Sequence, residues 1–170
     1  MTVTARSTEA VTAFMTYLHD FDLSSRLTRR GARQKFKEIP RLKKAITRVL
    51  LNLISNGFYA ATQRNAESND GTYEPTLTAA TKDLGDSVEI SIRDNGTGIP
   101  PKVKEKMFSP FFTTKPAGEG TGLGLSLSHD IIVKQHCGSI EVDTQPGEFT
   151  EFRIVLPRAG ASLAKSGQRS

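Results

Sequence analysis

The stretch from Gly118 to Leu125 has the residue spacing best suited to holding a charged ligand. Four of the seven residues from Gly118 to Gly124 are glycine, so the backbone can adopt positive φ angles and approach a ligand closely. Apolar residues follow at helical spacing, and the glycines therefore lead into the start of a helix. Free N–H groups and the helix dipole favour an anion such as phosphate at that place.

The glycine spacing excludes two common nucleotide motifs. A phosphate loop of the G-x-x-x-x-G-K-[ST] kind needs a Gly-Lys pair, and this sequence has none. A dinucleotide fingerprint needs glycines at positions i, i+2 and i+5, but Leu123 or Leu125 stands at i+5 here. If this stretch holds a nucleotide, other segments must supply the rest of the site.

Two asparagines, Asn52 and Asn56, stand four positions apart in a strongly apolar segment. In a helix they share one face, and buried asparagine side chains need hydrogen-bond partners. One interpretation is that both side chains cap neighbouring backbone groups. The other is that an asparagine carbonyl oxygen ligates Mg²⁺, which takes few protein oxygens when phosphates supply the others.

The string Asp94-Asn-Gly-Thr-Gly-Ile-Pro100 follows an alternating, strand-like segment. Asp, Asn and Gly are the usual residues of turns, so the string could be a turn and nothing more. In the functional interpretation, Asp94 accepts a hydrogen bond from an exocyclic amine of a base. Gly96 and Gly98 would then let the base approach the backbone, and Ile99 would pack against its ring.

A third polar group, Thr113, Thr114 and Lys115, follows the aromatic run of residues 108–112. The aromatic side chains could simply anchor a loop to the core. The hydroxyls and the ammonium group, however, stand just before the glycine-rich stretch. They could hold the phosphates of a nucleotide or form part of a lid over it.

The hydrophobic pattern predicts the elements that position these segments. Helices are expected over residues 8–19, 40–64, 102–108 and 121–136, with Gly138 capping the last one. Hairpins are expected from strands 76–82 and 87–93, and from strands 139–144 and 149–156. Residues 158–170 are polar and small, which is typical of a disordered tail. This order predicts an α/β sandwich with a mixed, mostly antiparallel sheet and helices on one face.

Composition fits one globular domain in a chain of 170 residues with a net charge of +5. A single cysteine, Cys137, excludes a disulfide framework and suits a reducing cytoplasm. No apolar run approaches the length of a membrane span. Ten basic residues and one acid, Glu38, lie between Arg26 and Arg48. This block could bind nucleic acid or an acidic partner, but a solvated helix face is the favoured interpretation because no aromatic interleaving accompanies it.

The order and spacing of these segments carry a resemblance that none of them carries alone. Asn-x-x-x-Asn, Asp-x-Gly-x-Gly-Ile, Phe-x-Pro-Phe-Phe-Thr-Thr-Lys and Gly-x-Gly-x-Gly-Leu-Gly-Leu resemble the ATP-binding catalytic domain of bacterial sensor histidine kinases. The wider group includes DNA gyrase B, Hsp90 and MutL, with the Bergerat-type ATP-binding fold. The resemblance runs from Ile39 to Pro157, and the string Phe-Phe-Thr-Thr-Lys distinguishes the kinases from the gyrase-type relatives.

The resemblance implies a role for each residue. Asn56 would ligate Mg²⁺ with Asn52 beside it, Asp94 would bind the adenine amine, and Lys115 and the glycine loop would close on the triphosphate. Arg64 could touch a phosphate, although a surface arginine is favoured, and His136 is interpreted as structural. The expected ATP-binding residues are Asn52, Asn56, Asp94, Gly96, Gly98, Ile99, Thr113, Thr114, Lys115, Gly118, Gly120, Thr121, Gly122, Leu123, Gly124, Leu125 and Thr150.

The resemblance also departs from the family at some places. Gly57 stands where alanine is usual, which should weaken the helix by ~1 kcal/mol. Cys137 stands where a second glycine is common. Residues 1–38 are too short for the helical hairpin with the phosphorylated histidine that these kinases place before this domain. The string His19-Asp20-Phe21 resembles the start of the phosphoacceptor motif but lacks the basic residue and proline expected after it. An exposed histidine at a helix end is therefore the favoured interpretation of His19, and no catalytic residue is assigned.

The resulting hypothesis is a cytoplasmic kinase domain with ATP and Mg²⁺ as cofactors. It would span residues 39–158, between an N-terminal segment, 1–38, and a tail, 159–170. It would transfer the γ-phosphoryl group of ATP to a histidine of a separate helical phosphoacceptor domain, and a response-regulator receiver domain would then accept it. Nucleic acid and membrane are not expected as partners.

Two alternatives remain. A non-kinase ATPase of the same superfamily would need a glutamate to activate water, and the segment 41–64 contains no Glu or Asp. A non-catalytic nucleotide-binding module would use the basic block to dock a partner.

Overall fold

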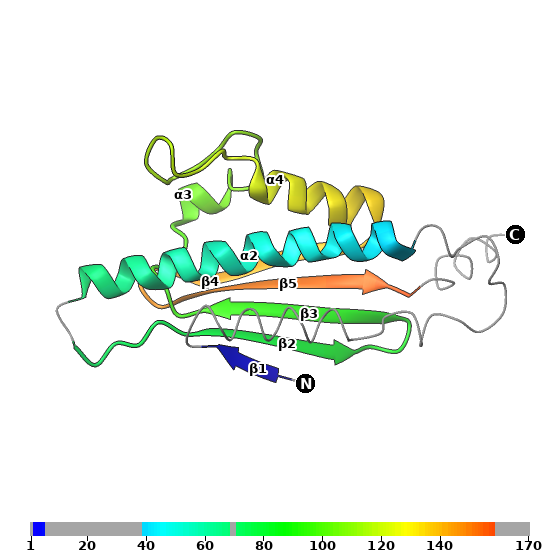
Figure 1. Cartoon of the computed structure of the whole chain (residues 1–170), viewed down its shortest axis with the longest axis horizontal. Coiled ribbons are helices and arrows are strands. Elements are labelled where there is room, and N and C mark those ends of the chain that lie inside the picture. Colours follow the sequence, from blue (N-terminus) through cyan, green and yellow to red (C-terminus); the bar gives the residue numbers. More distant parts are fainter. Residues whose placement is uncertain (1, 6–38, 69–70, 159–170) are drawn as a thin grey trace, which may run out of the picture.

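The computed structural model describes residues 2–5, 39–68 and 71–158, which form two layers (Figure 1). One layer is a five-stranded sheet in the order β1-β2-β3-β5-β4, and the described helices lie on one of its faces. The elements are β1 (Thr2–Ala5), α2 (Ile39–Glu67), β2 (Leu77–Asp83), β3 (Ser87–Asp94), α3 (Pro101–Lys104), α4 (Gly124–His129), η2 (Asp130–Gln135), β4 (Ser139–Gln145) and β5 (Phe149–Pro157). The predicted α/β sandwich is confirmed, and every described strand pairing is antiparallel.

The middle of the sheet sets the position of one site residue. Strand β3 lies between β2 and β5, and its last residue, Asp94, stands opposite Leu77 on one side and Thr150 on the other. Along β5 the side chains alternate: Thr150, Phe152 and Ile154 are buried under the helices. Because strand side chains point alternately to the two faces, Asp94 and Thr150 share the helix-covered face of the sheet.

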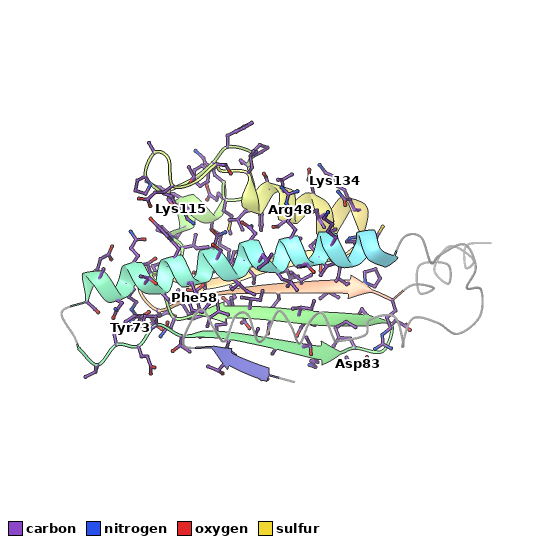
Figure 2. All side chains as sticks on the ribbon, in the orientation of Figure 1. Arg48, Phe58, Tyr73, Asp83, Lys115 and Lys134 are labelled. Atoms are coloured by element: carbon purple, nitrogen blue, oxygen red, sulfur yellow. The ribbon has the colours of Figure 1, made fainter. Side chains whose placement is uncertain are left out.

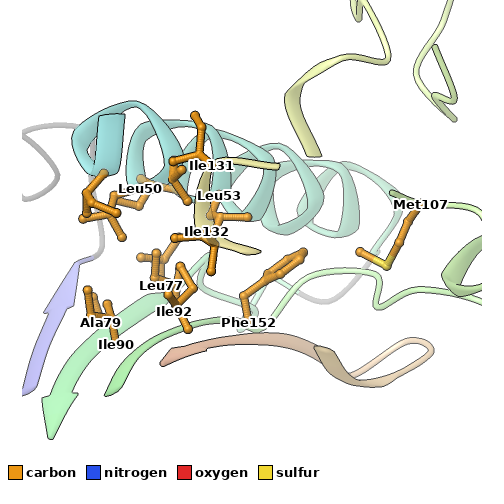
Figure 3. Packing of buried hydrophobic residues seen from close by; sticks show 14 residues of the cluster. Leu50, Leu53, Leu77, Ala79, Ile90, Ile92, Met107, Ile131, Ile132 and Phe152 are labelled. Atoms are coloured by element: carbon orange, nitrogen blue, oxygen red, sulfur yellow. The ribbon is translucent and has the colours of Figure 1, made fainter. Parts of the chain in front are cut away.

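Helix α2 packs along that face because its apolar residues recur at helical spacing. Val49 and Leu53 are fully buried, and Ile46 and Leu50 lie beside them. Figure 3 shows Leu50 and Leu53 in one cluster with side chains of the sheet and of η2. The buried cluster consists of Ile46, Val49, Leu50, Leu53, Ile54, Leu77, Ala79, Ile90, Ile92, Met107, Ile131, Ile132, Phe152 and Ile154. This packing fixes α2, and with it the two asparagines, over the end of β3.

The last helical segment differs from the prediction over 121–136. Helix α4 begins only at Gly124, because Gly122 adopts a φ of 66°, which a right-handed helix cannot include. The segment then continues as the π-helix η2 to Gln135. The left-handed residue of the helix end is Cys137, with a φ of 51°, and not Gly138, although Gly138 takes part in the predicted cap by donating its N–H to the carbonyl oxygen of Ile132 at 2.9 Å. Gly138 is needed for a different reason, since a Cβ there would lie 2.4 Å from the carbonyl oxygen of Val155.

Other predicted elements hold with small changes. Helix α2 and the two hairpins lie where the pattern predicts them, and the short helix expected over 102–108 covers only Pro101–Lys104 before turns begin. Strand β1 was not predicted, and it adds an edge strand that pairs with β2 from Thr2↔Ala80 to Ala5↔Leu77. The predicted helix over 8–19, His19 and the tail beyond residue 158 lie outside the described residues.

Candidate functional site

A cavity of about 400 Å³ opens between α2, the end of β3, α3 and residues 112–125. Its size is typical of a small-molecule site. The predicted residues that line it are Asn52, Asn56, Asp94, Gly98, Ile99, Thr113, Thr114, Lys115, Gly120, Thr121, Gly122, Gly124, Leu125 and Thr150. Its other lining residues are Ser55, Gly57, Tyr59, Ala60, Gln63, Thr97, Val103, Met107, Phe112, Glu119 and Phe152. Segments far apart in the sequence therefore converge on one cavity.

Asp94 is the buried acid of this cavity, with 4% of its surface exposed. Its Oδ1 accepts a hydrogen bond from the backbone N–H of Gly96 at 2.9 Å. Burial raises the pKa of Asp94 to about 6, while hydrogen bonds from the backbone of Gly96 and Thr150 act in the opposite direction. At neutral pH the side chain is therefore mainly a carboxylate, which accepts hydrogen bonds and cannot donate them.

The loop that follows Asp94 packs against two neighbours. A Cβ on Gly96 would lie 2.6 Å from the backbone carbonyl carbon of Ala60, so this glycine lets the loop touch α2. Gly98 has a φ of 66°, and a Cβ there would lie 2.3 Å from the carbonyl oxygen of Gln145. Gly96 does not line the cavity, and both glycines are required for packing of the loop.

Hydrogen bonds of two threonine hydroxyl groups connect this loop with β4 and β5. The backbone N–H of Ile99 donates to Thr144 Oγ1 at 2.9 Å, and Thr144 Oγ1 donates to the carbonyl oxygen of Phe149 at 2.8 Å. Thr150, 3% exposed, places its Oγ1 3.4 Å from that of Thr144. The Asp94 side of the cavity thus has a buried carboxylate and a hydroxyl, with apolar walls from Ile99 and Phe152.

Asn52 braces α2 against α4. Its Nδ2 donates to Ser128 Oγ at 3.1 Å, and Ser128 Oγ donates to the carbonyl oxygen of Gly124 at 2.9 Å. A Cβ on Gly124 would lie 2.2 Å from Asn52 Oδ1, so any other residue there would have to displace the asparagine side chain. The partner of this asparagine is therefore a side chain of another helix, and not the neighbouring backbone.

Asn56 faces a cation in this structure. Lys115 Nζ donates to Asn56 Oδ1 at 3.1 Å and lies 4.2 Å from the centre of the Tyr59 ring. Partial burial lowers the pKa of Lys115, and the nearby Glu119 carboxylate acts in the opposite direction. The Asn56 amide oxygen and the Tyr59 ring face thus lie next to the ammonium group at the cavity wall.

The donor set of this region limits what kind of metal site it could form. Within residues 2–5, 39–68 and 71–158, no group of three or more His, Cys, Asp and Glu side chains could hold a metal ion. The Asn56 oxygen is a ligand type that Mg²⁺ accepts, together with phosphate oxygens and water. The residues therefore fit a magnesium ion that arrives with a phosphate ligand.

Residues 111–123 form an irregular loop over the cavity, here called the lid loop. The ring of Phe111 is 75% exposed, and its backbone has a φ of 65°. Gly122 touches this backbone so closely that a Cβ would lie 2.3 Å from the carbonyl carbon of Phe111. Tyr59 Oη donates to Glu119 Oε2 at 3.4 Å, which ties the tip of the loop to α2. Two of the expected residues, Gly118 and Leu123, belong to this loop but do not line the cavity.

Several lining residues were missed by the sequence interpretation. Tyr59, Ala60 and Gln63 stand three, four and seven positions after Asn56, so helical spacing alone could have predicted them. Glu119 and Met107 had no comparable signal. Arg64 neither touches the cavity nor projects freely, because its guanidinium donates to backbone carbonyl groups of other segments.

The two histidines of this region also lie outside the cavity lining. Burial lowers the pKa of His136, and its Nε2 has no hydrogen-bond partner among the described residues. The ring of His129 lies 5.1 Å from that of Phe108. Neither residue contributes to the cavity chemistry.

Comparison with known proteins gives a family match over most of the chain. Residues 42–160 match the model of the family described as histidine kinase-, DNA gyrase B-, and HSP90-like ATPase. Sensor histidine kinase ZraS of Escherichia coli is 38% identical over 112 residues, which cover 66% of this chain and 21% of ZraS. Sensor kinase CckA of Brucella abortus is 55% identical over 73 residues, 43% of this chain and 8% of CckA. The chain thus spans a small part of the curated relatives that it matches.

Solved structures share the fold. The catalytic domain of histidine kinase ThkA superposes with a TM-score of 0.57 at 22% identity, covering 93% of this chain and 96% of that one. The mycobacterial sensor histidine kinase MprB gives a TM-score of 0.52 at 29% identity, covering 68% of this chain and 71% of that one. Among the described residues, no helix is both long and apolar enough to span a membrane.

Proposed function

Because the chain belongs to the family of histidine kinase-, DNA gyrase B- and HSP90-like ATPases, we propose that it acts as the ATP-binding catalytic domain of a sensor histidine kinase. Its relatives ZraS and CckA are named as such kinases. The observation that carries the proposal is that Asp94, Asn56 and Lys115 line one and the same cavity. These residues offer an acceptor for a base, a neutral oxygen ligand and a cation for phosphate.

The base would lie at the Asp94 side, here called the base end of the cavity (Asp94, Ile99, Met107, Thr150 and Phe152). The Asp94 carboxylate would accept a hydrogen bond from the exocyclic amine of adenine. A charge-assisted hydrogen bond in a buried place is strong, and a base with a carbonyl group at that position would lose it. The apolar side chains would pack against the ring.

The triphosphate would lie at the other side, here called the phosphate end (Asn56, Thr113, Thr114 and Lys115). In the ligand-free arrangement Lys115 donates to Asn56 Oδ1. An arriving phosphate would attract the ammonium group more strongly than an amide oxygen does, and Asn56 Oδ1 would then be free for Mg²⁺. The metal would supply charge neutralisation between phosphate oxygens. The lid loop would close over the triphosphate and exclude water.

The proposed reaction transfers the γ-phosphoryl group to a histidine of a separate helical domain. A neutral imidazole nitrogen attacks the γ-phosphorus, the bond from phosphorus to the bridging oxygen breaks, and ADP leaves with the electron pair. The imidazole is itself a nucleophile, so this chain needs no catalytic base. A receiver domain of a response regulator would then accept the phosphoryl group on an aspartate. The domain, residues 39–158 in this proposal, would act in the cytoplasm.

One observation favours a second candidate, ATP hydrolysis. Glu119 lines the cavity close to Lys115, so that a carboxylate is present at the phosphate end. It could activate water if the lid loop held it near the γ-phosphate. Helix α2 offers no acid over residues 41–64, where the related ATPases would need one.

The test mixes the protein with γ-labelled ATP, Mg²⁺ and a cognate histidine hairpin. Label on the hairpin that is stable to base and labile to acid supports the kinase proposal. Release of inorganic phosphate without a labelled hairpin would support hydrolysis, and bound ATP with neither product would indicate a non-catalytic module. A hairpin without its histidine serves as the control.

Two site variants test the residue assignment. Asn56→Asp and Asp94→Asn should abolish Mg-ATP binding while the fold stays intact, as measured by calorimetric titration and circular dichroism. Asn65→Asp and Asp86→Asn are matched controls, because they make the same chemical changes at exposed positions of α2 and of the β2–β3 turn. Unchanged ATP affinity in both site variants would overturn the assignment.

A further inference from the structure

Arg64 joins three segments of the chain behind the base end of the cavity. Its Nη1 donates to the carbonyl oxygens of Asn95 at 2.8 Å and Glu148 at 3.0 Å, with Gly96 O at 3.5 Å. Arg64 belongs to α2, Asn95 follows β3, and Glu148 belongs to the β4–β5 turn. One guanidinium therefore holds the loop beside Asp94 against both a helix and a hairpin.

Tyr73 extends the same contact on the other side of the loop. Its ring centre lies 4.8 Å from the Arg64 guanidinium carbon, and its Oη lies 2.8 Å from the carbonyl oxygen of Asn95 and 3.3 Å from that of Ala61. Asn95 in turn accepts from the backbone N–H of Thr76 at 2.8 Å and donates to the carbonyl oxygen of Glu74 at 2.8 Å. Figure 2 places Tyr73 near the C-terminal end of α2.

The β4–β5 turn completes this support. The backbone N–H of Gly147 donates to the carbonyl oxygen of Thr97 at 2.7 Å, and Gly98 lies against the backbone of Gln145. The residues on either side of this supported loop, Asp94 and Ile99, line the cavity, whereas Arg64 does not. The support thus acts on the site through the backbone, without touching its contents.

We propose that Arg64 is a positioning residue that fixes the loop 95–98 and thereby sets affinity and selectivity for the base, an inference that rests on the proposed ATP binding. Backbone carbonyl groups without strand partners need donors, and a planar guanidinium can serve two segments at once. A lysine ammonium has no flat face to replace the guanidinium that lies 4.8 Å from the centre of the Tyr73 ring. Loss of the guanidinium leaves the loop after Asp94 held less firmly, and with it the Gly96 N–H that orients the Asp94 carboxylate. A small misplacement of an acceptor is costly for recognition.

The first experiment measures amide hydrogen exchange in the ligand-free protein. Arg64→Ala should speed exchange of the Gly96 and Gly147 amides by roughly tenfold, because their hydrogen bonds open with the loop. The amides of Ile92 and Ile154, in the core strands, should keep their protection. Equal protection in the variant and the wild type, or a parallel loss at all four amides, would overturn the proposal.

The second experiment compares the dissociation constants of ATP, GTP and tripolyphosphate. Arg64→Ala should weaken ATP binding by roughly tenfold and GTP binding by less, so that the ratio of the two shrinks, while tripolyphosphate affinity is unchanged. Arg64→Lys should restore little of the loss. Arg48→Ala is the matched control, since Arg48 is an exposed arginine of the same helix. A merely structural role would lower all three affinities together and would contradict the proposal.

The two experiments separate this inference from the function on which it rests. Wild-type protein that fails to bind ATP would overturn the proposed function, and with it the predicted selectivity. The exchange measurement needs no nucleotide and would still decide whether Arg64 fixes the loop. Wild-type protein that binds ATP, with an Arg64→Ala variant of equal selectivity, would overturn only the inference.

Discussion

The base end of the cavity rests on the ends of two central strands, whereas the phosphate end is covered by a loop without regular structure. Asp94 is buried, and the loop after it is held by α2, by Tyr73 and by the β4–β5 turn. At the phosphate end, Lys115 makes one hydrogen bond to Asn56, and Phe111 stands 75% exposed. Regions with few buried contacts open at low free-energy cost. If the proposed function holds, base selectivity would depend on the rigid elements, and closure over the phosphates would depend on the lid loop.

The largest expected effect is on stability, and it comes from replacing Asp94, the buried acid of the base end. Burial raises the pKa of Asp94 from 3.8 to about 6, so folding favours the protonated carboxyl. The stabilising contribution of this group is complete below about pH 4 and is lost as the pH rises through 6. Asp94→Asn should therefore raise the free energy of unfolding by up to about 3 kcal/mol at pH 7 and by little at pH 4. Urea unfolding at both pH values measures this difference.

Asp86→Asn provides the control for that experiment, because Asp86 is exposed in the β2–β3 turn. It should show no comparable difference between the two pH values. A variant at Asp94 that is less stable than the wild type at pH 7 would contradict the cost assigned to the buried charge. The gain in stability with loss of ATP binding would mark Asp94 as a residue kept for function.

The next effect concerns the opposite end. Lys115→Ala removes a cation that would meet the triphosphate, and ATP affinity should fall by roughly 10- to 100-fold. Adenosine affinity should stay unchanged, because the base end does not contain Lys115. Calorimetric titration with both ligands separates the two ends. Lys104→Ala, an exposed lysine of α3, is the control, and an equal loss for adenosine would show that the ends are not independent.

Gly98, beside the base end, and Gly122, in the lid loop, have the same φ and therefore allow a direct comparison of how rigid the two regions are. Gly98 and Gly122 both have a φ of 66°, and at each a Cβ would lie 2.3 Å from a backbone atom. Gly98→Ala should lower the free energy of unfolding by about 2 kcal/mol, because the loop after β3 cannot move without its supports. Gly122→Ala should lower the free energy of unfolding by only the backbone strain, about 1 kcal/mol, because the lid loop can shift away from the contact, but it should weaken ATP binding. Thermal unfolding and ATP titration of both variants provide the measurement.

Gly118→Ala is the control for this pair, since Gly118 has a φ of 92° but no described atom within 4 Å of a built Cβ. It should cost only the backbone strain, about 1 kcal/mol. Equal destabilisation by Gly98→Ala and Gly122→Ala would mean that the two ends are equally rigid, and the comparison would fail.

The sequence predicted the elements with strong periodicity and the residues that carry chemistry. Helix α2 and both hairpins follow from apolar spacing, and the family assignment from four short motifs is confirmed by the match over residues 42–160. Strand β1 was not predicted because Thr2–Ala5 is short and two of its residues are threonines, so that it has no clear apolar pattern. An edge strand of this kind exists through pairing with β2, which no local pattern records.

Long-range contacts explain what could not be predicted at the site. Arg64 was expected at the surface or on a phosphate, but its partners lie 31 and 84 positions away along the chain and are backbone atoms. Every residue has a backbone carbonyl group, so the sequence does not indicate which of these groups Arg64 contacts, and only the fold shows it. The left-handed conformation of Cys137 was also not predicted, because glycine is the usual residue at such a position after a helix.

The smallest expected effect lies between the two ends, on α2. Gly57 stands where the family usually has alanine, and a Cβ there would lie 2.9 Å from Leu77 Cδ1 and 3.2 Å from Asp94 Cβ. Gly57→Ala gains about 1 kcal/mol of helix propensity but must displace a buried leucine and the acid itself. The free energy of unfolding should therefore change by less than about 1 kcal/mol, while ATP affinity falls and tripolyphosphate affinity is unchanged. Urea unfolding with paired titrations tests this, and a gain in stability with unchanged ATP affinity would show that the base end tolerates movement of Asp94.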